Sequence, residues 1–177
     1  MGNFREIVTK AVIGKAKKNT TQNIEVKCEN TPDTVLGCWI INHKFNGTNQ
    51  SGHVLINGTF DLNIWYSYDS DTKTAVSNHT ISYQDIMNVT LKNDTMLDNT
   101  SEIIVRSLKQ PTVSNVDIKD GAVNLRVEKE LGVEIVGNTK VKVSVEEFDD
   151  DYEEIIDDEL EDTIENIDAE YLDKDVN

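Results

Sequence analysis

Apolar and polar side chains alternate most regularly between residues 54 and 68. The apolar positions there are Val54, Ile56, Phe60, Leu62, Ile64, Tyr66 and Tyr68. Alternation over this length predicts a half-buried β-strand. Gly58 falls on the inward set, where a bulge or a close backbone approach would let a long strand bend around a core. Trp65 falls on the opposite set, so we expect its indole on the outer face of the sheet.

A second long alternation runs through residues 133–145. It follows a hairpin signal, because residues 116–118 and 123–127 are apolar at alternate positions and flank Asp120 and Gly121. Both central residues of a type I′ turn need positive φ, which the pair Asp-Gly accepts. We therefore expect a tight hairpin at this dipeptide.

Other segments carry less regular strand patterns. Residues 36–45 contain Trp39 and predict a strand that ends at Asn46 and Gly47. The first segment fits either a helix face or a strand, and we favour a strand from Glu6 onward. Weaker strand patterns occur at residues 81–91 and 103–108.

The strand count and the breaks between strands indicate the fold class. Pro32 and Pro111 stand where strands are expected to break, because proline cannot donate to a ladder. About eight mostly antiparallel strands with short turns predict an all-β domain, either a sandwich or a partly closed barrel.

The charges divide the chain into two parts. Residues 146–177 hold 17 of the 33 acidic residues and a single basic one, Lys174, whereas the rest has 16 acidic and 16 basic residues. A neutral body followed by an anionic segment indicates two tasks. We expect a β-rich self-association domain over residues 1–147 and an acidic partner-binding tail over residues 148–177.

The tail also has an apolar pattern. Its apolar residues at spacings of four and three are Tyr152, Ile156, Leu160, Ile164, Ile167 and Tyr171. These spacings place them on one helical face, while like charges on the other face weaken an isolated helix. We therefore predict a largely disordered or conditionally helical tail that folds on a partner. A disordered acidic tail that only keeps an assembly soluble is the alternative.

The chain offers little apparatus for catalysis or cofactor binding. It has no G-x-S-x-G, P-loop or G-x-G-x-x-G motif, and Cys28 and Cys38 lack the close spacing of zinc ligands. The three histidines are expected in turns or at strand ends, and solvated acids of turns or polar strand faces are expected at Asp61, Asp69, Asp71 and Asp85. We therefore predict that the protein is not an enzyme and uses no metal or cofactor.

Composition also bears on partners and location. No run of residues is apolar enough to span a bilayer, and the first 18 residues are charged and amphipathic rather than a signal sequence. The body has no basic surplus and the tail would repel phosphates. We expect synthesis in a cytoplasm, free or buried rather than bridged cysteines, and neither nucleic-acid binding nor membrane insertion.

Aromatic residues leave a second hypothesis open. Trp39, Trp65, Tyr66 and Tyr68 could form a platform for a glycan or another ligand, which would make the chain a non-catalytic binding module with a solubilising tail. Aromatic residues on strands are more often core than platform. Because Trp65 alone is out of phase with the buried set, it is our candidate for self-association, and Trp39 is expected in the core.

Four sequence blocks resemble a known family. They are residues 5–12 (REIVTKAV), 37–44 (GCWIINHK), 63–68 (NIWYSY) and 136–141 (VGNTKV), followed by the acidic tail. Together they are similar to the CotE-type outer spore coat morphogenetic family over the full chain.

This resemblance implies a function and partners. It implies a structural scaffold that is made in the mother-cell cytoplasm of a sporulating bacterium and assembles around the forespore as part of the outer coat. It further implies a homo-oligomer that binds outer spore coat proteins and the ATPase of the coat basement layer.

Overall fold

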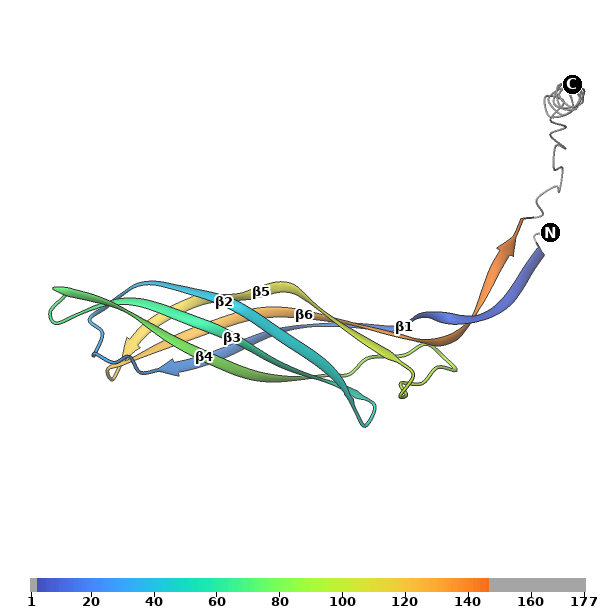
Figure 1. Ribbon diagram of the computed structural model, residues 1–177, viewed down its shortest axis with the longest axis horizontal. Coiled ribbons are helices and arrows are strands. Elements are labelled where there is room, and N and C mark those ends of the chain that lie inside the picture. Colours follow the sequence, from blue (N-terminus) through green and yellow to red (C-terminus); the bar gives the residue numbers. More distant parts are fainter. Residues whose placement is uncertain (1–2, 147–177) are drawn as a thin grey trace, which may run out of the picture. The chain divides into compact units, whose positions relative to one another are not determined.

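The computed structural model describes residues 3–146, of which residues 5–143 form a compact unit. Six strands make up almost all of it: β1 (Asn3–Val26), β2 (Thr34–Gln50), β3 (His53–Tyr68), β4 (Lys73–Met87), β5 (Glu102–Lys119) and β6 (Ala122–Val145) (Figure 1). No helix occurs within these described residues. The predicted all-β class is confirmed.

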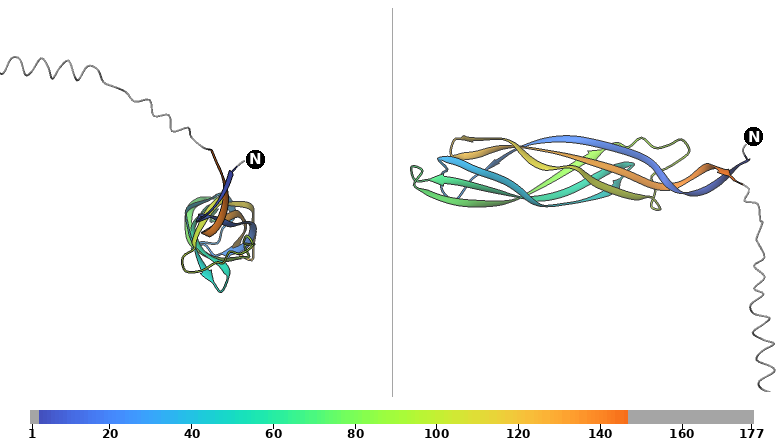
Figure 2. Two further views of the ribbon diagram at one scale, coloured as in Figure 1. Left: turned by 90° about the vertical axis from the view of Figure 1, so that its right-hand side faces the viewer. Right: turned by 90° about the horizontal axis from the view of Figure 1, so that it is seen from above.

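The strands form two antiparallel three-stranded sheets, with strand orders β1-β6-β5 and β2-β3-β4. Along one margin β5 lies beside β2. At the other margin the segment after β4 reaches β1, where Gly14 and Leu91 form a β-bridge and the Lys92 amide donates to the Ile13 carbonyl at 2.8 Å. The sheets thus face each other and meet at both margins, as the left-hand view of Figure 2 shows. This is the predicted sandwich or partly closed barrel.

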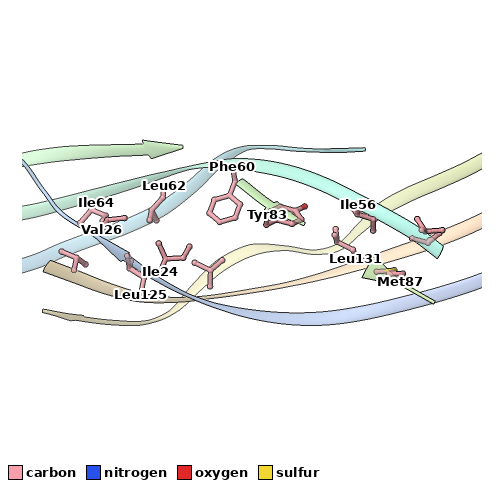
Figure 3. Packing of buried hydrophobic residues seen from close by; sticks show 14 of the residues in the cluster. Ile24, Val26, Ile56, Phe60, Leu62, Ile64, Tyr83, Met87, Leu125 and Leu131 are labelled. Atoms are coloured by element: carbon pink, nitrogen blue, oxygen red, sulfur yellow. The ribbon is translucent and has the colours of Figure 1, made fainter. Parts of the chain in front are cut away.

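The core lies between the sheets and comes mainly from β3 and β6, the central strand of each. Their nearly fully buried residues are Val54, Ile56, Phe60, Leu62, Ile64, Tyr66, Val123, Leu125, Val127, Leu131, Val133 and Ile135. Figure 3 shows Phe60 and Leu62 of β3 opposite Ile24 of β1 and Leu125 of β6. The alternation predicted for residues 54–68 is confirmed.

The tight turns show where sequence pattern specifies a hairpin and where it does not. Asp120 and Gly121 both have positive φ, 52° and 74°, and join β5 to β6 as predicted. The predicted end of β2 at Asn46-Gly47 is wrong, because β2 continues to Gln50 and turns at Ser51 and Gly52.

The strands are fewer and longer than expected. Residues 103–108 and 116–118 belong to one strand, β5, which runs through Pro111. The expected break at this proline is wrong, because β5 is an edge strand and its register shifts between Lys109 and Thr112, where a missing N–H is tolerated. Pro32, in contrast, lies between β1 and β2 as expected.

Candidate functional site

Two exposed tryptophans lie on the outer face of the β2-β3-β4 sheet. Trp65 is 44% exposed and Trp39 is 43% exposed, although neither lies in a loop. In the strand register Trp65 pairs with Gly37 on β2 and with Val76 on β4. Because Gly37 has no side chain, the surface between the two indoles stays open.

The indole rings of Trp39 and Trp65 both lie close to Gly37. A Cβ added at Gly37 would lie 3.9 Å from Cε3 of Trp65 and 4.0 Å from Cζ3 of Trp39, so both indoles border this position. Ile41 and Val76 continue the apolar surface with 47% and 50% exposure. We call Trp39, Ile41, Trp65 and Val76 the tryptophan patch.

The patch ends at a polar group on β3. Asp61 pairs with Ile41 across the strands and accepts hydrogen bonds of 2.8 Å from Asn42 Nδ2 and from Thr80 Oγ1. These two bonds, Asn42 first, lower the pKa of the Asp61 carboxyl below its usual value. Asp61 is therefore an ionised acid that gives the apolar patch a charged margin.

The structure changes the predicted roles of the other aromatic residues. Trp39 is not in the core, and this prediction is wrong. Tyr66 is 1% exposed, and Tyr68 packs partly buried against the core. Of the four aromatics considered as a platform, Trp39 and Trp65 alone remain on the outer face.

A lysine lies in the interior, on β6. Lys129 is 3% exposed, in phase with the buried valines of that strand. Its Nζ lies 3.0 Å from Asp85 Oδ2 on β4 and donates a 2.8 Å hydrogen bond to Thr20 Oγ1 on β1. It also lies 3.9 Å from the centre of the Tyr83 ring. A buried charge is thus compensated by an anion, a hydroxyl and an aromatic face.

Tyr83 links this lysine to two further strands. His43 Nε2 on β2 lies 2.7 Å from Tyr83 Oη, and His43 Nδ1 lies 3.1 Å from Gln110 Oε1 on β5. Since an amide oxygen only accepts, we assign the proton to Nδ1, so that Nε2 accepts the tyrosine O–H. The buried polar cluster, named for its buried members Tyr83 and Lys129, also contains the half-buried Thr20, His43 and Asp85 and the exposed Gln110. It joins five of the six strands.

The surroundings keep two members of this cluster neutral. Burial, and then the Asp85 carboxylate, raise the pKa of Tyr83 to about 12. Burial lowers the pKa of His43, against the hydrogen bond with Gln110 and together with the charge of Lys129. Near pH 7 Tyr83 and His43 are therefore both neutral. Asp85 Oδ2 has no hydrogen-bond partner, so the ion pair with Lys129 is what compensates it. Because the polar groups of the cluster contact one another across the strands, we assign it a structural role.

The prediction for the acidic residues holds only in part. Asp85 was expected in solvent and is instead paired with Lys129 at 12% side-chain exposure, so that expectation is wrong. Asp69 pairs with Lys73 at 3.1 Å, and hydrogen bonds from Ser67 and then Thr34 lower the pKa of Asp71. Both of these acids lie in the β3–β4 turn, as expected.

The cysteines are half-buried free thiols. Burial raises the pKa of Cys28 against a hydrogen bond with Ser77, and burial together with nearby Cys28 raises the pKa of Cys38. Within residues 3–146 no group of three metal-ligating side chains occurs, and no helix is long and apolar enough to cross a membrane.

The proposed partner-binding residues lie outside the described part of the chain. They are Tyr152, Ile156, Leu160, Ile164, Ile167 and Tyr171. The predicted boundary between residues 147 and 148 falls there as well, so both remain predictions.

Sequence reasoning missed the buried lysine, although the sequence carries a signal for it. Val123, Leu125 and Val127 set an alternating phase that Leu131 and Val133 resume, and Lys129 occupies the same phase. A charged residue in an inward phase predicts a buried partner of opposite charge. That partner, Asp85, could not be identified before the strands were paired.

Comparison with known proteins assigns the chain to one family. The family model for outer spore coat protein E (CotE) matches residues 3–174. No curated protein and no solved structure gives a match. Because the match covers nearly the whole chain, the protein belongs to the CotE family of outer spore coat proteins.

Proposed function

We propose that this chain is a non-catalytic structural scaffold of the outer spore coat, which assembles by binding copies of itself and recruits outer-coat proteins. The observation that carries the self-association is the tryptophan patch. Large aromatic residues on an exposed sheet face are typical of protein interfaces, where they supply most of the binding energy. Family membership supplies the context of the outer spore coat.

The rigid support of the patch favours an interface. Trp65 lies on β3, whose neighbouring residues Ile64 and Tyr66 are anchored in the core. A side chain on such a strand loses little backbone freedom on binding, so less ordering entropy opposes association. An apolar core and the buried polar cluster hold the two sheets together. Such rigidity is expected of a domain that must keep its shape in an assembly.

We expect Trp65→Ala to lower self-association while leaving the fold intact. Because the indole is 44% exposed, the loss of unfolding free energy should fall well below the roughly 3 to 5 kcal/mol of a buried tryptophan. Trp39→Ala should behave in the same way. Light scattering of the full chain measures the association, and thermal unfolding measures the stability.

Leu108→Ala is the matched control for these variants. Leu108 is 53% exposed but lies on β5, in the other sheet. This variant should associate like the unchanged chain. If Trp65→Ala and Trp39→Ala also associate normally, the tryptophan patch is not the contact.

A glycan-binding module is the second candidate, because two exposed indoles on a flat sheet face could also stack on sugar rings. Titration of the chain and of Trp65→Ala with glycans separates the two functions. Saturable binding that Trp65→Ala abolishes, together with unchanged association, would favour the binding module over the scaffold.

The tail is proposed to recruit partners, namely outer spore coat proteins and the ATPase of the coat basement layer, after synthesis in the mother-cell cytoplasm. Its apolar stripe would enter a groove of the partner, while the surrounding carboxylates would speed the encounter and make it sensitive to salt. The stripe consists of Tyr152, Ile156, Leu160, Ile164, Ile167 and Tyr171.

Replacing Ile156 and Leu160 together by Asp should abolish recruitment of outer-coat proteins, because the stripe loses its centre. The control is Asn166→Asp with Ala169→Asp, which adds the same charge off the stripe. Recruitment is measured by co-sedimentation of outer-coat proteins with assembled chain. Normal recruitment by the Ile156 and Leu160 variant would leave the tail as a solubilising appendage.

A further inference from the structure

The first part of β1 has an open edge. β1 is an edge strand of its sheet, and its open side is first closed at Ile13 and Gly14, which contact residues 91–92. Among the described residues, none pairs with the open side of residues 5–12. The N–H and C=O groups of this edge are a template for another strand.

Within residues 3–146, no third strand pairs with the part of β6 beside it either. The register of β5 and β6 begins at Glu102 and Val136, so β6 continues beyond its β5 partner. The side chain of Ile13 lies against Gly137, and Lys15 Nζ lies 3.5 Å from Glu134 Oε1. Residue numbers on β6 fall as those on β1 rise, so the two strands are antiparallel. Residues 5–12 and 137–143 therefore form a two-stranded ribbon.

A ribbon of two strands is marginal by itself in water. Val8 and Ile7 of the ribbon are 72% and 42% exposed, one on each face. Apolar side chains beside an open backbone edge indicate that a further strand completes the ribbon.

The residues of this edge are complementary to themselves. Glu6, Val8 and Lys10 share one face because side chains alternate along a strand. Neither Glu6 nor Lys10 makes an ion pair within the described residues. Four residues apart on one strand, they lie about 13 Å from each other and cannot pair within the chain.

An antiparallel pairing with a second copy, centred on Val8, would both cover the open backbone edge and give Glu6 and Lys10 partners of opposite charge. It places Glu6 opposite Lys10 of a second copy, Val8 opposite Val8, and Lys10 opposite Glu6. On the other face it places Ile7 opposite Thr9. Opposite charges and apolar residues in directly facing positions stabilise strand pairs. Such a contact is isologous, since each copy contributes the same surface.

We propose that residues 5–12 of β1 pair edge to edge with the same residues of a second copy, in the antiparallel register centred on Val8. The inference rests on the self-association proposed above and assigns a contact to it. An isologous contact alone closes at a dimer. Growth into a larger assembly needs a second surface, which the tryptophan patch supplies, so Trp65→Ala should leave dimers.

Charge reversal tests this register. Glu6→Lys and Lys10→Glu, taken singly, each create two like-charge pairs per dimer and should weaken dimer formation about tenfold or more. The double variant Glu6→Lys with Lys10→Glu restores both pairs and should dimerise like the unchanged chain. Sedimentation velocity of full chains that also carry Trp65→Ala measures the dimer without further growth.

Two controls make the outcome specific. Glu25→Lys and Lys27→Glu make the same charge changes in and just after β1 but outside the ribbon, and they should not alter dimer formation. The double charge variant should also fail to form mixed dimers with chains of unchanged charge, because equal charges then face each other.

The possible results separate this contact from the proposed function. If the chain with all its native residues associates but the single reversals dimerise normally, or the double variant does not recover, the β1 contact is wrong and self-association stands. If the native chain stays monomeric at every concentration, the scaffold function itself is wrong.

Discussion

Lys129→Ala should lower the unfolding free energy by roughly 3 to 5 kcal/mol, because it leaves the Asp85 carboxylate buried without its cation. Thr20 and the Tyr83 ring lose their contacts with Nζ at the same time. Chemical denaturation monitored by tryptophan fluorescence measures the loss, since Trp39 and Trp65 both lie in the folded body.

Two variants identify the cause of that loss. Lys129→Met with Asp85→Leu removes both charges and should recover most of the stability, because apolar residues of similar volume often replace a buried ion pair without loss. Lys142→Ala removes an exposed lysine of the same strand and should change stability by less than about 0.5 kcal/mol. A small effect of Lys129→Ala would mean that Asp85 is not held as a buried anion.

Gly58→Ala should destabilise the domain by about 1 to 3 kcal/mol through overpacking. Gly58 pairs with Tyr83 across β3 and β4, and an added Cβ would lie 2.2 Å from Cζ of the tyrosine ring. That ring is held by His43 and Lys129, so it cannot move aside without breaking the buried polar cluster.

The coupling with Tyr83 makes this prediction specific. In a Tyr83→Ala background the ring is absent, and Gly58→Ala should cost little or become stabilising, since alanine suits a strand better than glycine. Gly37→Ala is the control, because its Cβ would meet the two indoles at ordinary contact distances of 3.9 and 4.0 Å. Equal costs of Gly58→Ala with and without the ring would show that the ring does not fill this space.

The strand β3 was predictable because period-two alternation decides the direction of every side chain on a central strand. Gly58 on the inward face and Trp65 on the outer face both follow from that period. The hairpin at Asp120 and Gly121 was predictable for a different reason, namely that its turn type demands particular residues.

Trp39 was not predictable, because β2 lacks a continuous period. Its register shifts twice, between Val35 and Gly37 and between Ile41 and Lys44, so the phase cannot be carried along the strand. Trp39, Ile40 and Ile41 are all apolar, and the position of Ile40 opposite Leu62 decides which of them faces inward. That pairing is tertiary information.

The end of β2 was missed because Asn46-Gly47 has turn composition but a packing role. A Cβ at Gly47 would lie 2.5 Å from Cγ2 of Val105, so this glycine lets β5 approach β2. The buried polar cluster was missed for a related reason. Lys129 and Asp85 are far apart in sequence, and only the arrangement of β4 against β6 brings their charges together.

The mass of the intact 177-residue chain in solution tests the central claim most directly. Light scattering over a hundredfold range of concentration should show a mass that rises with concentration well above 19.9 kDa, with extended assemblies visible by electron microscopy. A mass that stays at 19.9 kDa across the whole range would contradict the proposal that this protein is a self-assembling scaffold.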